Sequence, residues 1–433
     1  MAINIIKTPE LYTPAGNQII YQITDDNVNL VYYKINLYDE VTYQKISSLN
    51  IYPTPAYRNG AFINLASILQ NYVKTTIKKN DTIIESLNGD IINYRIDIFK
   101  YTKNSNGDIS WAPQPAIPSR YVFNGSVPRV SFDSYDYTKL VCTTSNTGKF
   151  LTHKPDKSSI KFWGTEYLYF ISHSNRITSA VFNFGYKGGN VITKEFAVAT
   201  GTIMGRVNVS PRAFTSNNIE VNDLEYFTVQ LFNGVTPVSE IRTYVADKFQ
   251  CNAQPVNLIW KNEIGGIDSY TFQNPKETLS VERTNIKVNP YHINQSGYYS
   301  NSNDNIFKSD NQIINVTDKS TYSVVSDWLT NDEYKWLATI IKSKQVYVEL
   351  TDGKLLPVQL NDSSIRIENT KYSNSPLQLT INFSCESGLN ISWNESQQFP
   401  DRVGMVGFNY PSGILNQVTA FEYVVGNNGE VII

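Results

Sequence analysis

The chain contains 433 residues, more than one hydrophobic core ordinarily supports, so we expect three domains. Hydrophobic residues make up 41% and charged residues 18%, against roughly 25% charged in average domains, so the composition favours packed cores over disorder. The 37 Lys and Arg nearly balance the 39 Asp and Glu, which leaves a formal charge of -2 and no basic field for a phosphate backbone. We therefore expect no specific nucleic-acid binding.

The sequence does not indicate export or membrane insertion. The segment Met1–Lys7 lacks the basic start and apolar run of a signal peptide, and no stretch reaches the roughly 18 apolar residues of a membrane span. Cys142, Cys251 and Cys385 lie far apart, which argues against a disulfide framework and against a CxxC metal site. These features predict synthesis in the cytoplasm without membrane insertion.

Residues 1–149 are predicted to form a β-sandwich-like domain with one short helix. Apolar and polar residues alternate over Val31–Leu37 and over Ile92–Ile98, as on half-buried strands. Between these runs, Leu65–Val73 has the spacing of an amphipathic helix and follows a capping asparagine. The proline-rich segment Trp111–Pro118 cannot pair within a central strand, so we expect it to run over the surface.

Residues 150–274 repeat the strand pattern and predict a second β-sandwich-like domain. Ala180–Tyr186 alternates up to a glycine pair, and Phe227–Leu231 alternates up to Asn233-Gly234, a dipeptide typical of two-residue hairpin turns. The run Leu258–Phe272 has large aromatic residues on both sides of a second glycine pair. We expect it to form a hairpin that ends this domain and begins the next.

Residues 275–390 are predicted to form a small α+β module. Thr330–Glu333 has the pattern of a capping box, which predicts a helix that continues through Ile341. A hairpin over Val346–Leu360 follows, and Leu377–Phe383 completes an antiparallel sheet under the helix. The predicted fold class is therefore mainly β, with tandem antiparallel β-sandwich-like modules followed by one helix on an antiparallel sheet.

Two polar segments are candidates for contacts with partners. His292–Asn305 has the composition of a loop or arm. Residues 391–433 form a Gly/Asn-rich C-terminal arm that ends in a short apolar strand, which can add to the edge of a neighbouring sheet. The predicted interface residues in these segments are Tyr298, Tyr299, Val431, Ile432 and Ile433.

The sequence has no recognisable catalytic, cofactor-binding or metal-binding constellation. His153, His173 and His292 have no second ligand at a metal-binding spacing. Nucleophile elbows and phosphate-binding loops are absent, and the pair Gly265-Gly266 precedes a strand rather than a helix. We therefore predict no catalytic, cofactor or metal residues and a protein that is not an enzyme.

Four segments carry a resemblance to a known family: Tyr12–Ala15, the amphipathic segment after Asn64, the run Leu258–Phe272, and the block Asp327–Leu360. Together they resemble tail and ring components of crAss-like podoviruses infecting Bacteroidetes. The similarity extends over residues 10–390. Its motifs are structural, so it assigns no active-site residue.

The resemblance implies a structural virion protein, a subunit of a symmetric ring in a phage tail or head-to-tail assembly. Its partners would be copies of itself and other tail or portal-proximal virion proteins, after synthesis in the host cytoplasm. An alternative is a carbohydrate-binding tail or adhesin module, which predicts a patch of exposed Trp and Tyr. A glycan hydrolase is a further alternative, and it requires two carboxylates that face each other across a cleft.

Overall fold

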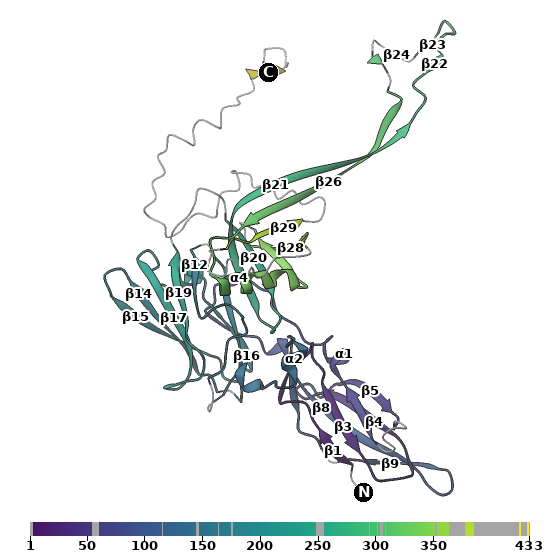
Figure 1. The fold of residues 1–433 in the computed structure, drawn as a ribbon, viewed down its shortest axis with the longest axis vertical. Coiled ribbons are helices and arrows are strands. Elements are labelled where there is room, and N and C mark those ends of the chain that lie inside the picture. The colour runs from purple at the N-terminus through teal and green to yellow at the C-terminus, as the bar shows by residue number, and fades with distance from the viewer. Residues whose placement is uncertain are drawn as a thin grey trace. The chain divides into compact units, whose positions relative to one another are not determined.

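The computed structural model describes residues 3–432 except 54–59, 115, 144–146, 163, 175, 248–254, 294, 301, 304–305, 308, 351–352, 363–376, 385–423 and 426–430. The fold is mainly β, as predicted, and its strands form two sandwich-like modules and a closed barrel (Figure 1). Met1–Ser392 form one compact unit and Trp393–Ile433 a second.

The first module is a sandwich of two sheets. One sheet contains β1 (Asn4–Lys7), β3 (Ile20–Thr24) and β6 (Ala61–Asn64). The other has the order β2 (Tyr12–Pro14), β10 (Arg120–Phe123), β8 (Ile91–Lys103), β4 (Leu30–Asp39) and β5 (Lys45–Ile51). A further strand, β9 (Ile109–Pro113), also pairs with β8. The alternations predicted in β4 and β8 are confirmed, because Tyr33 and Tyr94 and the apolar residues in step with them are buried between the sheets.

The predicted helix in this module is shorter than expected. It was predicted over Leu65–Val73, whereas α1 spans only Ala66–Leu69. The predicted capping role of Asn64 is wrong, because Leu65 is the N-cap and no side chain caps this helix. The Asn64 Oδ1 instead accepts hydrogen bonds from the N–H groups of Ala66 at 3.1 Å and Ile19 at 3.2 Å, just before the helix begins. Beyond Leu69 the chain continues in turns, in which the Val73 N–H still donates to the Leu69 carbonyl at 3.3 Å. The chain then leads to β7 (Ile84–Ser86), which pairs in the second module.

The proline-rich segment lies at the surface, as predicted, but it begins as a strand. Trp111 and Pro113 belong to β9, whose residues are all exposed. β9 pairs on one side with β8. A strand that has a free side tolerates a proline, because the missing N–H costs no ladder hydrogen bond there.

The second module is also built from two sheets. One contains β11 (Val141–Cys142), β13 (Tyr167–Ser172), β16 (Met204–Asn208) and β7. The other has the order β12 (Lys157–Lys161), β19 (Arg242–Asp247), β17 (Leu224–Asn233), β14 (Ser179–Tyr186) and β15 (Val191–Ala197). A short strand, β18 (Thr236–Pro237), also pairs with β17. The short helix α3 (Pro211–Ser216) contributes Phe214 to the core, where its ring meets Phe182, Phe184 and Phe227. The connection between the modules contains η1 (Asn88–Asp90), α2 (Arg129–Phe132) and η2 (Tyr137–Lys139).

Two features of the sandwiches differ from the prediction. The sheets were expected to be antiparallel, but the pairs β2–β10, β11–β13 and β12–β19 are parallel. The boundary expected at residue 149 is crossed, because β7 pairs with β16 of the second module. Parallel partners and inserted strands come from distant parts of the chain, so local alternation carries no signal for them.

The predicted antiparallel sheet of the third module closes into a barrel. Its strands follow the order β20 (Val256–Lys261), β21 (Ile267–Lys287), β26 (Asn311–Val325), β29 (Thr380–Ser384), β28 (Leu355–Leu360) and β27 (Val346–Glu349). The hairpin around Trp260 is confirmed, but it supplies two strands to this barrel, so the boundary expected after residue 274 falls within β21. A closed sheet leaves no edge inside the barrel.

The helix of this module begins as predicted. In α4 (Asn331–Leu337), the Thr330 side chain accepts a hydrogen bond from the Glu333 N–H, and Glu333 accepts one from the Thr330 N–H at 2.9 Å. The helix continues as η3 (Ala338–Lys342). Leu337 is fully buried, and the Trp336 ring lies 5.6 Å from that of Trp260. The helix is therefore fixed to the barrel by its apolar side.

A shared core joins the three modules. Phe123, Tyr169 and Ile267, one from each module, belong to the same buried apolar cluster. Gly265, with φ +96°, lies where the hairpin β20–β21 meets the first module, and a Cβ there would stand 1.7 Å from the Asn124 carbonyl oxygen. Only glycine allows this close approach.

The second unit contains one described element, a pair of short strands. β30 (Val424–Val425) pairs antiparallel with β31 (Val431–Ile432). The predicted terminal apolar strand is thus present, and its pairing partner is the strand just before it in the chain.

Candidate functional site: the β21–β26 arm

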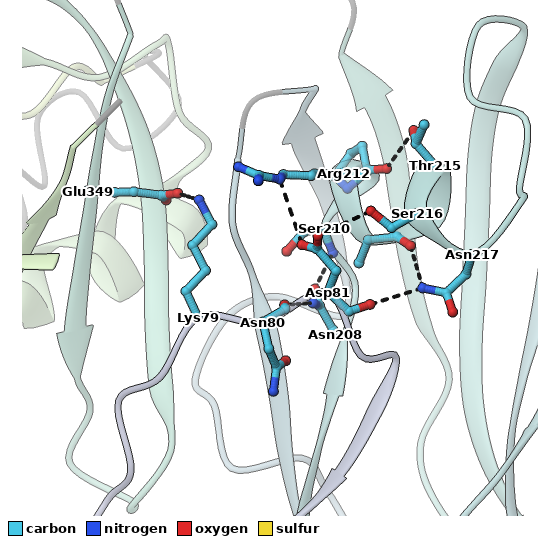
Figure 2. Close-up of polar contacts among 12 residues, drawn as sticks. Lys79, Asn80, Asp81, Asn208, Ser210, Arg212, Thr215, Ser216, Asn217 and Glu349 are labelled. Carbon is cyan, nitrogen blue, oxygen red and sulfur yellow. Dashed lines mark hydrogen bonds and ion pairs between the residues drawn. The ribbon is translucent and has the colours of Figure 1, made fainter. Parts of the chain in front are cut away.

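Polar side chains cluster at several places in the body of the protein, which comprises the two sandwich-like modules and the barrel without the β21–β26 arm. Figure 2 shows residues 79–81, which cross from the first module to the second, among side chains of α3, β16 and β27. Lys79 pairs with Glu349, and the Asn208 side chain donates to the Asn80 carbonyl at 2.8 Å. Three side chains gather at Asp81: Ser216, Asn217 and Arg212. The hydrogen bonds from Asn208 and Asn217 hold backbone carbonyls of the crossing segment and the other contacts hold its side chains, so the cluster fastens this segment.

An ion pair anchors β7 nearby. The Arg206 side chain, only 1% exposed, donates to Glu85 Oε2 at 2.6 Å and lies 4.0 Å from the centre of the Tyr167 ring. Burial acts to raise the pKa of the Glu85 carboxyl, but the charge and hydrogen bonds of Arg206, with the Asn80 amide, lower that pKa overall. The charges of Arg206 and Glu85 therefore pair with each other within the fold.

A second buried network connects the second module to the barrel. Lys154 Nζ donates to Glu166 Oε2 at 2.5 Å, and the Tyr244 hydroxyl donates to Glu166 Oε1 at 2.6 Å. Trp336 Nε1 donates to Asp268 Oδ2 at 2.8 Å. Burial raises the pKa of the Asp268 carboxyl, although hydrogen bonds from Thr152, Trp336 and Asn262 oppose that rise. Because both carboxylates are enclosed and hydrogen-bonded, they are not arranged across a cleft.

Among the described histidines and cysteines, His173 and Cys142 are joined through their backbones, because the His173 N–H donates to the Cys142 carbonyl at 3.0 Å. His153 is exposed, and the His173 ring meets the edge of Tyr12 at 5.9 Å. Burial raises the pKa of the Cys142 thiol to about 12, while Cys251 and Cys385 lie outside the described residues. Within the described ranges, no group of three or more His, Cys, Asp or Glu residues is placed to hold a metal ion.

The strands β21 and β26 continue together well beyond the barrel as a two-stranded arm (Figure 1). β20 pairs with β21 only up to Phe272, and β29 pairs with β26 only from Thr321 onward. Between these points and the arm lies a bulge at Asn274 and Pro275, where Asn274 has a φ of 51°. The exposed part of β21, Lys276–Lys287, has a length of about 40 Å at 3.3 Å per residue.

One face of the arm, called its apolar face below, carries most of the arm's exposed apolar side chains, alongside Arg283 and Asp318. Residues opposite each other in the ladder share a face, and this face contains the pairs Val281↔Asp318, Arg283↔Val316 and Asn285↔Ile313. The register shift beyond Thr284 makes Ile314 a bulge residue. The exposed apolar side chains of this face and its bulge are Leu279 59%, Val281 39%, Ile313 52%, Ile314 56% and Val316 54%.

The other face of the arm is mainly polar. It contains Thr278, Ser280, Glu282 and Thr284 of β21 and Asn315, Thr317 and Lys319 of β26, with Ile286 as an apolar exception. Opposite charges lie diagonally across the ladder on both faces, Arg283 near Asp318 on one and Glu282 near Lys319 on the other. Among the described residues, every ion pair lies in the body and none on the arm.

The far end of the arm holds the first pair of predicted interface residues. β22 (His292–Ile293) pairs with β23 (Tyr299–Ser300), and β24 (Ser302–Asn303) pairs with β25 (Ile306–Phe307). Tyr298 is 73% exposed and Tyr299 76% exposed. Val431 and Ile432 form β31, but Ile433 lies outside the described residues, so the structure brings the two predicted groups into different units.

The polar tip of the arm is predicted from the sequence, but its two long strands are not. Leu279, Val281 and Val316 alternate with Ser and Thr, which is typical of a strand. The alternation of Thr278, Ser280 and Thr284 with apolar residues was the available signal.

A second exposed feature is a row of aromatic rings on the outer face of β4, β8 and β9. Tyr32 and Tyr101 stack with ring centres 4.4 Å apart, and Tyr52 lies 5.6 Å from Tyr32. Trp111 is opposite Tyr101 in the ladder and meets the edge of Phe99 at 5.5 Å. The end members of the row, Trp111 at 59% and Tyr52 at 62%, are the most exposed.

Comparison with known proteins gives distant similarities only. No protein-family model and no curated protein matches the chain. One similar structure is Dpr2 Ig1-Ig2 in complex with DIP-Theta Ig1-Ig3, at 10% identity and a TM-score of 0.15, covering 58% of this chain and 100% of that chain. Another is the tetra-tandem repeat in the extending region of a large adhesion protein, at 8% identity and a TM-score of 0.21, covering 89% of this chain and 73% of that chain. At these TM-scores neither similarity supports a conclusion about function.

Within the described ranges, the structure contains no helix whose length and apolar character would let it span a bilayer.

Proposed function

We propose that the protein is a structural subunit of a phage virion that assembles with copies of itself into a symmetric ring, in a tail or head-to-tail assembly. The β21–β26 arm carries this proposal. It extends beyond the barrel without adding to any core, and it exposes apolar side chains on one face. An isolated two-stranded ribbon is marginal in water, so an arm of this length gains stability from a partner.

A ring also requires two different surfaces on each subunit, since each copy contacts the next through a heterologous interface. The arm has two different edges, one from β21 and one from β26. In this proposal the protein reaches the virion after synthesis in the host cytoplasm. Its further partners are other tail or portal-proximal proteins, and it needs no cofactor, catalysis or nucleic-acid binding.

Removing the arm tests the proposal. Thr278 and Thr321 are opposite each other, so replacing residues 279–320 with Asn-Gly closes the ladder with a two-residue turn. We expect this variant to keep the melting temperature of the full chain and to be missing from purified particles. A smaller deletion, residues 295–304, removes only the tip and asks whether Tyr298 and Tyr299 are needed.

Mass spectrometry of purified particles gives the result, and native mass spectrometry gives the copy number of the free protein. The full chain should be a stoichiometric component of the particle. If the armless protein enters particles at the normal copy number, the arm is not the assembly element. A full chain that is absent from particles at every stage contradicts the virion role itself.

A carbohydrate-binding module is a second candidate function, and the aromatic row favours it. Exposed Trp and Tyr rings offer apolar faces for the C–H surface of sugars. The exposed ends of the row, Trp111 and Tyr52, lie on an outer sheet face. A glycan hydrolase has less support, because the enclosed Glu166 and Asp268 are held by Lys154 and Trp336.

Sugar binding is tested on the full chain with a panel of neutral oligosaccharides and Trp fluorescence. Trp111→Ala should abolish any binding, while Trp328→Ala, which removes a 68% exposed Trp outside the row, should leave it unchanged. Equal effects of the two substitutions contradict a binding role for the row.

A further inference from the structure

We propose that arms of neighbouring copies pair edge to edge, so that the free edge of β26 in one copy joins the free edge of β21 in the next. This inference rests on the proposed function and names the contact that builds the assembly. The partner that binds each edge of the arm is therefore a second copy of this chain.

The edges are suited to such pairing. Beyond Phe272 on β21 and before Thr321 on β26, the outer N–H and C=O groups have no strand partner among the described residues. Unpaired edges of this kind template the addition of a strand. β21 and β26 are antiparallel, so joining β26 of one copy to β21 of the next continues the same antiparallel order.

The faces of the arm agree with a closed set of arms. Edge pairing places the apolar face of each arm beside that of its neighbour, because side chains alternate sides along every strand. When the set closes, Leu279, Val281 and Val316 of all copies face one enclosed side. The Ser- and Thr-rich face is left toward solvent, and no arm retains a free edge.

The charges specify the partner. If the contact keeps the register of the arm, Arg283 of one copy lies diagonally across from Asp318 of the next, and Glu282 lies across from Lys319. Both faces are therefore complementary to a second copy. A lipid or purely apolar occupant would bury Arg283 and Asp318 and offer no charged group of its own to either side chain, which is costly.

Charge reversal tests the contact. In full chains, Arg283→Asp places an acid near Asp318 of the neighbouring copy, and Asp318→Arg places two cations together. We expect each variant alone to raise the concentration needed for assembly by about tenfold or more. Native mass spectrometry and light scattering over a concentration series give this value. Lys194→Asp, at an exposed position on β15, has the same change of charge as Arg283→Asp, serves as its control and should behave as wild type.

Mixing the two variants separates contacts between copies from contacts within one arm. An equimolar mixture restores both opposite-charge pairs between alternating copies, so it should assemble at the wild-type concentration. If the pairs form only inside each arm, mixing has no effect, and only the double variant Arg283→Asp with Asp318→Arg recovers.

The outcome is distinguishable from failure of the proposed function. Wild-type assembly that is indifferent to both charge reversals overturns edge pairing, and the virion role then depends on particle composition alone. A wild-type chain that stays monomeric at its highest soluble concentration also overturns edge pairing. Rescue by mixing supports it directly.

Discussion

The two ends of the same ladder behave differently. Val324 and Val316 both belong to β26 and both lie in the stretch paired with β21, yet Val324 is fully buried and Val316 is 54% exposed. The difference is a third neighbour, because β29 and the barrel interior cover the first and no described element covers the second. Strand pairing satisfies the backbone, but burial of side chains requires another layer.

Charged side chains repeat this contrast. In the body, Arg206 meets Glu85 and Lys154 meets Glu166. On the arm, Arg283 and Asp318 lie diagonally across the ladder with no ion pair between them. The body therefore uses its charges for its own fold, and the arm presents them to its surroundings.

Truncation of Leu337, which packs α4 against the barrel, should cause the largest loss of stability in the body. Leu337 is fully buried on α4, so Leu337→Ala removes packed methyl groups and leaves a cavity. We expect a loss of about 2–5 kcal/mol in the free energy of unfolding, measured by urea denaturation of the full chain. An unchanged midpoint would show that the helix does not stabilise the barrel.

The matched valines test the comparison on a single strand. Val324→Ala should lower the free energy of unfolding by about 1–3 kcal/mol, because two buried carbons are lost. Val316→Ala should change the stability of the free chain by about 0.5 kcal/mol or less. Calorimetry of the monomer compares them, and equal losses would mean that something covers the arm within one chain.

The helix cap should give an intermediate effect. Thr330→Ala removes the side-chain acceptor of the Glu333 N–H, at a cost of about 1 kcal/mol. Thr330→Ser retains that acceptor and serves as the control. The thermal midpoints of the two variants should therefore differ. Equal midpoints would show that the cap does not stabilise the helix.

A fall in pH should lower the stability of the body and leave that of the arm unchanged. This is the smallest of the expected effects. The folded-state pKa of Glu85 lies below its ordinary value of 4.5, so the stabilisation from Arg206 is complete above that pH and is lost as the pH falls through the lowered pKa. The gap in melting temperature between wild type and Glu85→Gln should shrink on acidification. Arg283→Gln, without an ion pair to lose, should show no such pH-dependent gap in the monomer. A gap for Glu85→Gln that is constant with pH contradicts this account.

Local signals in the sequence determined most of the individual elements. Alternation located β4, β8, β14 and β17, and the capping box at Thr330 located the start of α4. The turns at Gly234 and Gly265 were readable because positive φ angles favour glycine. Tyr298 and Tyr299 were identified as exposed because their surroundings are too polar for a core.

Which elements pair with each other depends on the three-dimensional fold. The insertion of β7 beside β16, the parallel pairs and the closure of the barrel depend on contacts between distant residues, which no local period encodes. The arm is the clearest case: residues 276–287 have an ordinary strand pattern, and the pattern is the same whether the apolar face meets a core or solvent. The alternation of these residues is a property of the sequence, but which of them lack a covering layer depends on the neighbours that the fold supplies.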